Sequence, residues 1–172
     1  MTSSAQGSGR IIGSLRSAGG KGVVRMESRI DTDIDDVWSA LTDPQRLARW
    51  LGEIEGDLRL GGEFRARFYA SGWEGIGWVD LCEPPQRLLV RTQEAEDDVH
   101  VIEATLAADG EQTLLVIEER GMPLDHLAAY GAGIQVHVED LAAHLAGRAR
   151  CDAAARWAEL QPAYEALAVK GG

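Results

Sequence analysis

Glu119 and His137 are the two residues whose positions in this chain most favour chemistry. Glu119 shares one face of a predicted strand with Leu115 and Ile117, so its carboxyl is expected to point inward near the end of that strand. A carboxyl in an apolar setting can anchor a ligand or act as a general acid. His137 directly precedes the apolar Val138 in a helical pattern and can flank the same space. The alternatives are a solvated strand end for Glu119 and a water-facing ring for His137.

A metal or cofactor site is not indicated by the remaining chemical groups. Asp140 and His144 lie four residues apart in a helical pattern, a spacing that permits a shared metal ion but more often gives a surface ion pair. No third ligand accompanies them. The chain also has no nucleophile elbow, phosphate-binding glycine loop or zinc-spaced cluster. We therefore assign no metal, no cofactor and no catalytic residue.

A long helix is predicted from Pro123 to Gly147. Its apolar residues recur three or four positions apart and fall on one stripe. They are Leu127, Tyr130, Ile134, Val138, Leu141 and Leu145. Gly131 and Gly133 cost such a helix roughly 1 kcal/mol each relative to alanine, so we expect close backbone approach or free space beside them.

Before this helix the apolar residues mostly alternate with polar ones, which predicts strands separated by glycine and proline turns. The predicted strands are Val23 to Ile30, Ile54 to Leu60, Glu63 to Tyr69, Gly75 to Glu83, Leu88 to Gln93, Val99 to Ala107 and Thr113 to Glu119. Two short helices are expected after the first strand, with Asp33 among the capping residues of the first and Asp43-Pro44 between the two.

This order of elements predicts the α+β class: a curved antiparallel sheet of about six to seven strands wrapped around one long helix. Such a sheet twists and curls, and a single helix does not fill the concavity. We therefore expect a cavity between the sheet and the helix.

The predicted domain occupies residues 23–147. Residues 1–22 are rich in glycine and serine and free of acids, so we expect a disordered extension; a transit peptide is the alternative, but the glycines would break its helix. Residues 148–172 form a helical extension, with a pattern from Cys151 to Val169 interrupted by Pro162. We expect this extension to pack on the outside of the domain or against a partner, and its exposed Trp157 and Tyr164 would allow a homodimer.

The charge of the chain limits its partners. The 172 residues carry a net charge of -11, and the four basic residues of positions 1–25 have no acidic neighbour there, so the rest carries -15. A body this acidic disfavours nucleic acid and anionic membranes. No apolar run spans a bilayer and no secretory signal is visible, and Cys82 and Cys151 have no metal or redox spacing. We expect a cytoplasmic protein with reduced thiols, a single disulfide being the alternative.

Several motifs occur in an order that resembles the START-like or SRPBCC superfamily, and most closely the bacterial homologues of the activator of the heat-shock protein 90 ATPase. The matching motifs run from about Val24 to Gly147. They are Val37-Trp38, Thr42-Asp43-Pro44, Arg49-Trp50, Leu60-Gly61-Gly62-Glu63-Phe64, Glu83-Pro84-Pro85 with Arg87-Leu88, and Gly133 with Val138, Leu141 and Leu145. The resemblance implies the helix-grip fold. Two positions depart from the family pattern: Gln112 replaces a common glycine, and Ile134 replaces a common tryptophan, which would enlarge the cavity or change its ligand preference.

The apolar faces, together with the position that the resemblance implies for Trp50 at the cavity mouth, give a predicted cavity wall. Its members are Trp50, Phe68, Trp78, Ile102, Ile117 and Ile134, and plain core packing is the alternative for each. Four arginines could form a basic spot near the mouth or simply a solvated face. They are Arg46, Arg49, Arg65 and Arg67.

Three functions fit these expectations. The first is non-catalytic binding of a small hydrophobic or amphipathic ligand, oriented by Glu119. The second is a polyketide cyclase-like or hydrolase-like enzyme that moves protons with Glu119 or His137. The third is a protein-interaction or co-chaperone-like role that uses the C-terminal helix.

Overall fold

The computed structural model describes residues 10–93 and 99–169. Within them, eight strands form one antiparallel, unclosed sheet in the order β1-β2-β8-β7-β6-β5-β4-β3. The strands are β1 Gly13–Ala18, β2 Lys21–Ile30, β3 Gly52–Gly56, β4 Glu63–Phe68, β5 Glu74–Glu83, β6 Arg87–Gln93, β7 Val99–Asp109 and β8 Gln112–Met122. The helices are α2 Ile34–Thr42, α3 Pro44–Trp50, the short 3₁₀ helix Leu124–His126, α4 Leu127–Leu145 and α5 Ala153–Glu165. The predicted α+β architecture is confirmed.

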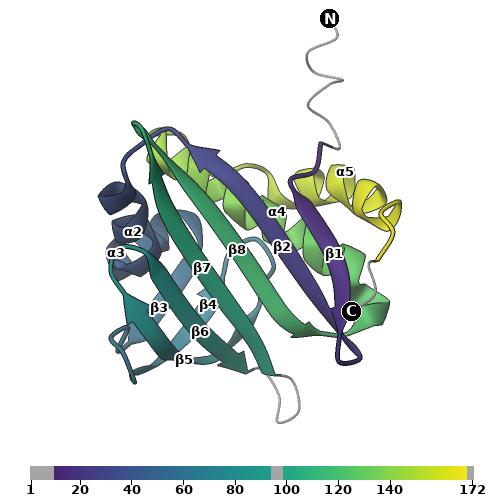
Figure 1. Ribbon diagram of the computed structural model, residues 1–172, viewed down its shortest axis with the longest axis horizontal. Coiled ribbons are helices and arrows are strands. Elements are labelled where there is room, and N and C mark those ends of the chain that lie inside the picture. Colours follow the sequence, from purple (N-terminus) through teal and green to yellow (C-terminus); the bar gives the residue numbers. More distant parts are fainter. Residues whose placement is uncertain (1–9, 94–98, 170–172) are drawn as a thin grey trace, which may run out of the picture.

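Helix α4 lies along one face of the sheet, with α2 and α3 near one of its ends and α5 beside β1 (Figure 1). The inner face of the sheet supplies apolar side chains from alternate positions, such as Val24 and Met26 of β2 and Leu115 of β8. These side chains pack against buried residues of α4, including Leu127 and Leu141. The alternation seen in the sequence therefore identifies the face that holds the core.

The two short helices are capped as the sequence predicts. The Asp33 side chain accepts a hydrogen bond from the backbone N–H of Asp36, and the Asp43 side chain accepts one from that of Gln45. Asp43 ends α2 and caps α3, so the chain turns sharply between the two helices. The indole N–H of Trp50 then donates to the Ala40 carbonyl at 2.9 Å, which ties α3 to α2.

Strand β1 corrects the prediction for the N-terminal extension. Residues 13–18 pair antiparallel with β2 through a turn at Gly19-Gly20, where both glycines have positive φ. Leu15 is 2% exposed and belongs to the main core. The glycine- and serine-rich composition suggested disorder, but the Gly-Gly pair makes a hairpin turn and Leu15 anchors the strand. The remainder of the predicted disordered stretch, residues 1–9, lies outside the described residues.

Helix α5 packs on the domain, one of the two options that the sequence left open, and does so partly through Tyr164, which we expected to be exposed. Leu160 and Tyr164 are both fully buried, and α5 continues through Pro162. The Tyr164 hydroxyl donates to Oε1 of Gln135 at 2.6 Å, and that same oxygen accepts the backbone N–H of Ile12 at 3.1 Å. Gln135 thus joins α4, α5 and the N-terminal segment at one buried point.

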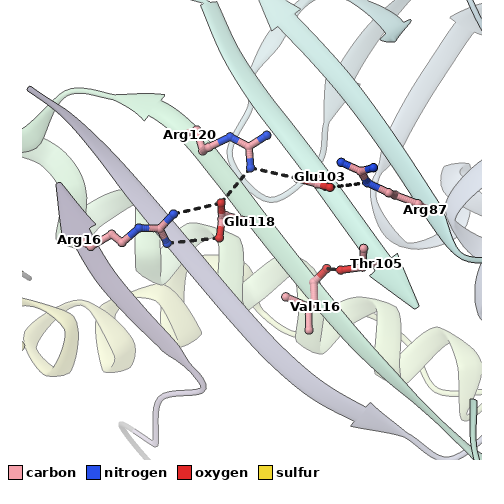
Figure 2. Close-up of polar contacts among 7 residues, drawn as sticks. All are labelled: Arg16, Arg87, Glu103, Thr105, Val116, Glu118 and Arg120. Atoms are coloured by element: carbon pink, nitrogen blue, oxygen red, sulfur yellow. Dashed lines mark hydrogen bonds and ion pairs between the residues drawn. The ribbon is translucent and has the colours of Figure 1, made fainter. Parts of the chain in front are cut away.

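A chain of ion pairs crosses the other face of the sheet (Figure 2). Glu118 pairs with Arg16 at 3.2 Å and with Arg120 at 2.8 Å, and Arg120 also reaches Glu103 at 3.1 Å. Arg87 completes the chain with a 2.6 Å contact to Glu103. Partial burial alone would raise the pKa of both glutamates, but the hydrogen bonds from the arginines outweigh it and lower each pKa. The network therefore joins β1, β8, β7 and β6 on the face opposite α4.

Two negative findings concern the described part of the chain. No helix there combines the length and apolar character that a membrane crossing requires. Both cysteines are free, so the disulfide that the sequence left open is not formed.

The two glycines of α4 meet opposite surroundings. A Cβ at Gly131 would lie 2.8 Å from Cδ1 of the buried Tyr164 ring and 3.3 Å from a methyl carbon of Leu15, whereas a Cβ at Gly133 would meet nothing within 4 Å. Gly131 therefore lies at a close contact and Gly133 beside free space. These are the two explanations that the sequence suggested for glycines in this helix.

Alanine substitutions at Gly131 and Gly133 should have opposite effects on the stability of the protein. Gly133→Ala should raise the free energy of unfolding by about 0.5 to 1 kcal/mol, because alanine is the better helix former and has room. Gly131→Ala should lower it by about 1 kcal/mol, since the strain of overpacking exceeds the gain in propensity. Urea unfolding measures both, and equal effects of the two substitutions would contradict the assignment.

Candidate functional site

The candidate site consists of two adjoining hollows between the sheet and the helices. The larger has a volume of about 700 Å³ and the smaller about 180 Å³. Six residues line both hollows: Phe68, Thr92, Ile102, Glu119, Ile134 and His137. The departure from the family pattern at Ile134 therefore lies where the two hollows meet.

The larger hollow is bordered by aromatic rings. The rings of Phe68 and Trp73 pack at a tilt of 37° with centroids 4.9 Å apart, and Tyr130 and Trp157 line the same space. The Trp157 indole N–H donates to the Ala129 carbonyl at 3.2 Å, which fixes the α5 side of the wall. The described β4–β5 turn and the first residues of α5 thus lie on the border of the hollow.

The smaller hollow continues beneath α3 and is almost entirely apolar. Trp50, Phe64 and Ile117 line it, together with Val138 and Leu141 of α4. Apart from Glu119 and His137, its described lining holds threonines as the only polar side chains. This part of the cavity can offer a ligand mainly apolar contact.

Glu119 and His100 form the polar centre of the wall. Sheet register places Glu119 opposite Ile102 on β7, and His100 stands two residues earlier on the same face. The Nδ1 atom of His100 lies 3.3 Å from Oε1 of Glu119, and the His100 ring packs edge-on against Tyr130 with centroids 5.6 Å apart. The Glu119 side chain is 15% exposed and lines both hollows.

His137 faces the same space from α4. Its ring meets Phe68 edge-on, with centroids 5.4 Å apart. Burial lowers the pKa of His137 from 6.5 to about 4, because the apolar wall disfavours the charged ring. Its Nδ1 is buried with no hydrogen-bond partner in the described part of the chain. His137 is therefore a neutral imidazole near pH 7.

Most of the residues expected in the wall lie there. Phe68, Ile102 and Ile134 line both hollows, and Trp50 and Ile117 line the smaller one. Glu119 and His137 also line both, so neither faces bulk water as the alternatives would have required. Whether any of these residues contacts a ligand stays a prediction.

Trp78 is the exception and lies on the outer face of the sheet. Its indole donates to Glu63 at 3.0 Å, and the Arg91 guanidinium stacks over its ring at 4.7 Å. The cause is Gly77, where a Cβ would collide with the Phe64 ring at 2.4 Å. Because the Phe64 ring fills the inner face at the glycine, the neighbouring tryptophan points away from the cavity.

Sequence reasoning missed several wall residues. His100, Thr92 and Tyr130 line the larger hollow. A signal for His100 was present, since it stands two positions before Ile102 and must share its face. Thr92 pairs with His100 across β6 and β7, a register that the sequence does not reveal.

Asp140 and His144 do not act together. Asp140 is buried and accepts the Cys151 backbone N–H at 2.9 Å, while His144 accepts a hydrogen bond from Arg46 at 3.2 Å. The described residues contain no group of three or more histidine, cysteine or acidic side chains placed to hold a metal ion. Asp140 and His144 therefore each make a separate structural contact.

Solved structures of similar proteins have the same fold as this chain. The crystal structure of CalU16 from Micromonospora echinospora is similar, with 29% identity and a TM-score of 0.75 over 90% of this chain and 94% of that chain. DynU16, from the dynemicin biosynthetic locus, is 30% identical with a TM-score of 0.69; the match covers 76% of this chain and 50% of that one. A Bordetella parapertussis protein, BPP1335, shares the fold at 22% identity, with a TM-score of 0.71 over 94% of this chain and 95% of that one.

The search among curated proteins gave no match. Residues 31–146 match the profile of the family described as Activator of Hsp90 ATPase homolog 1-like protein. The matched segment extends from the turn before α2 to the end of α4, and so contains most of the sheet and the helix that frames the cavity. The chain belongs to the Activator of Hsp90 ATPase homolog 1-like family and has its START-like fold.

Proposed function

We propose that this protein binds a small hydrophobic or amphipathic molecule in the cavity between the sheet and α4. The single observation that supports this most strongly is the hollow of about 700 Å³ between the sheet and the helices. This volume lies within the range of roughly 300 to 1,000 Å³ that is usual for small-molecule sites.

The composition of the wall indicates how affinity would arise. Burial of apolar ligand surface contributes about 25 cal/mol per Å², and the aromatic and aliphatic side chains of both hollows offer that surface. A few polar groups among them, Glu119, His100 and His137, would orient the ligand. This division between apolar contact and few polar groups is typical of binding sites.

Gly133 offers a direct test, because a side chain there would project into open space on the cavity wall. Gly133→Leu should fill part of the larger hollow and weaken binding of the neutral apolar dye N-phenyl-1-naphthylamine by roughly tenfold or more. Fluorescence titration measures the dissociation constants. Gly133→Ala is the matched control, since it changes the helix in the same place but leaves most of the volume.

Two results would count against the proposal. One is a wild-type protein that fails to bind the dye. The other is equal affinity in the wild type and Gly133→Leu, because the dye would then bind elsewhere.

An enzymatic function is the second candidate, and a specific observation favours it. Glu119 and His137, named from the sequence as possible proton-transfer groups, line the same hollows, and His100 adds a third titratable group beside Glu119. Hydrolysis of 4-nitrophenyl butyrate separates the candidates. If the protein is a hydrolase, Glu119→Gln or His137→Asn should abolish hydrolysis of this ester. If it is only a binding protein, the wild type should hydrolyse the ester no faster than Gly133→Leu, whose cavity is partly filled.

A protein-interaction function has less support. Tyr164, one of the two aromatic residues expected on the outer surface of α5, is buried in the domain, and Trp157 borders the cavity. Homodimerization through the outer face of α5, a co-chaperone-like role and a cytoplasmic location stay predictions.

A further inference from the structure

We infer that the ligand is an apolar ring-containing amine whose positive charge pairs with Glu119. This inference rests on the proposed function and specifies the substance that the cavity selects. It is drawn from the charges on the wall, from the free side of the Glu119 carboxyl and from the aromatic rings around it.

The charges on the wall are strongly one-sided. Among the described residues that line either hollow, Glu119 is the only carboxylate, and no lysine or arginine is present. The other titratable side chains of this lining are Tyr130 and three histidines: His137, which is neutral, His100, which faces Glu119, and His126, which is exposed beside the larger hollow. A carboxylate or phosphate in this space would meet a like charge without a permanent cationic partner, which is unfavourable where water is excluded.

The basic spot considered from the sequence does not change this balance. Arg46 pairs with Asp36 at 2.7 Å, and Arg67 pairs with Glu53. Neither these two nor the other arginines of that set appear in the described lining of the hollows. Among its described lining residues the cavity therefore has no lysine or arginine to pair with an anionic ligand such as a fatty acid.

The Glu119 carboxyl keeps one oxygen available. His100 contacts Oε1, while no hydrogen bond from the described residues reaches Oε2. Since Glu119 borders both hollows, a donor group in either could reach this carboxyl. A protonated amine donates up to three hydrogen bonds and brings the opposite charge, so it suits this position better than a neutral donor does.

The aromatic wall supports the same choice. Phe68, Trp73, Tyr130 and Trp157 border the larger hollow, and ring faces attract ammonium groups as well as apolar rings. The net charge of -11 also raises the local concentration of cations around the protein. Cation attraction and apolar burial thus occur in one space.

Three naphthalene probes with one carbon skeleton test the inference. They are 1-naphthylmethylamine, 1-naphthalenemethanol and 1-naphthoate, each measured by displacement of N-phenyl-1-naphthylamine at about pH 8, above the ordinary pKa of histidine. We expect the amine to bind at least roughly tenfold more tightly than the alcohol, and the carboxylate to bind most weakly. In Glu119→Gln the ratio of amine to alcohol affinity should fall to about 1.

Two further variants keep the result interpretable. Glu111→Gln removes one negative charge from an exposed position outside the cavity and should keep the amine preference, which excludes a general effect of net charge. Glu119→Asp keeps a carboxylate at this position and should retain a clear preference for the amine, so that a loss of the preference in Glu119→Gln is due to the missing charge and not to a folding defect.

The possible failures are distinct. If the dye and all three probes fail to bind, the proposed function itself is wrong. If the alcohol binds as tightly as the amine, if the carboxylate binds most tightly, or if the preference survives in Glu119→Gln, the binding function stands and the amine inference is overturned.

Discussion

Tyr164→Ala is expected to lower the free energy of unfolding by about 3 to 5 kcal/mol, the usual cost of removing a large buried aromatic side chain. Tyr164 is fully buried and packs against Gly131 of α4 and the Leu15 region of β1. Its hydroxyl also donates to Gln135, the residue that joins α4 to the N-terminal segment. Removal of the ring would therefore leave a void where three segments distant in sequence meet.

Urea unfolding of three variants checks this expectation. Tyr164→Phe keeps the ring and should cost only about 1 kcal/mol for the lost hydrogen bond. Trp157→Ala is the matched control on the same helix, because its ring is only partly buried and borders the cavity; it should cost less than Tyr164→Ala. A loss below about 1 kcal/mol in Tyr164→Ala would show that α5 does not belong to the cooperative unit.

This arrangement explains why the domain limits were hard to predict. The segment from β2 to α4 contains long alternating and helical patterns, and the structure has the predicted elements there. Strand β1 is short and helix α5 is rich in alanine, and each is held mainly by the other segments, through Leu15, Gln135 and Tyr164. Their stability comes from tertiary contacts, such as those of Gln135 with Ile12, 123 positions away, and with Tyr164, 29 positions away, which a local pattern does not contain.

The residues of the cavity wall, too, could be predicted from the sequence only in part. Period-two alternation correctly placed Ile102, Ile117 and Glu119 on the inner face, because strand geometry fixes that choice. Alternation alone did not give the direction of the Trp78 side chain, which depends on the Phe64 ring of the neighbouring strand that packs over Gly77. His100 was missed although it shares a face with Ile102, because the sequence did not give the register between β7 and β8 that places it 3.3 Å from Glu119. Side-chain direction within a strand was thus predictable in most cases, whereas the register between strands was not.

Acidification should destabilise the protein through His137. Its pKa is about 4 in the folded state against an ordinary value of 6.5, so the unfolded chain binds a proton more readily than the folded one. The stabilisation is complete above the unfolded pKa and is lost as the pH falls from about 6.5 through about 4. At 1.36 kcal/mol per pKa unit, the full effect is about 3 kcal/mol, of which roughly 2 kcal/mol should be lost between pH 7 and pH 4.5.

Carboxylates also titrate in this range, so the measurement is a difference between proteins. His137→Asn removes the titrating ring and should lose about 2 kcal/mol less than the wild type between the two pH values. His126→Asn, which changes the exposed histidine at the border of the cavity, should behave like the wild type. If His137→Asn and the wild type lose stability in parallel, the His137 ring is hydrated and the cavity contains water in contact with it. A difference of the expected size would instead identify an apolar cavity wall around a neutral imidazole, the condition under which burial of an apolar ligand contributes affinity.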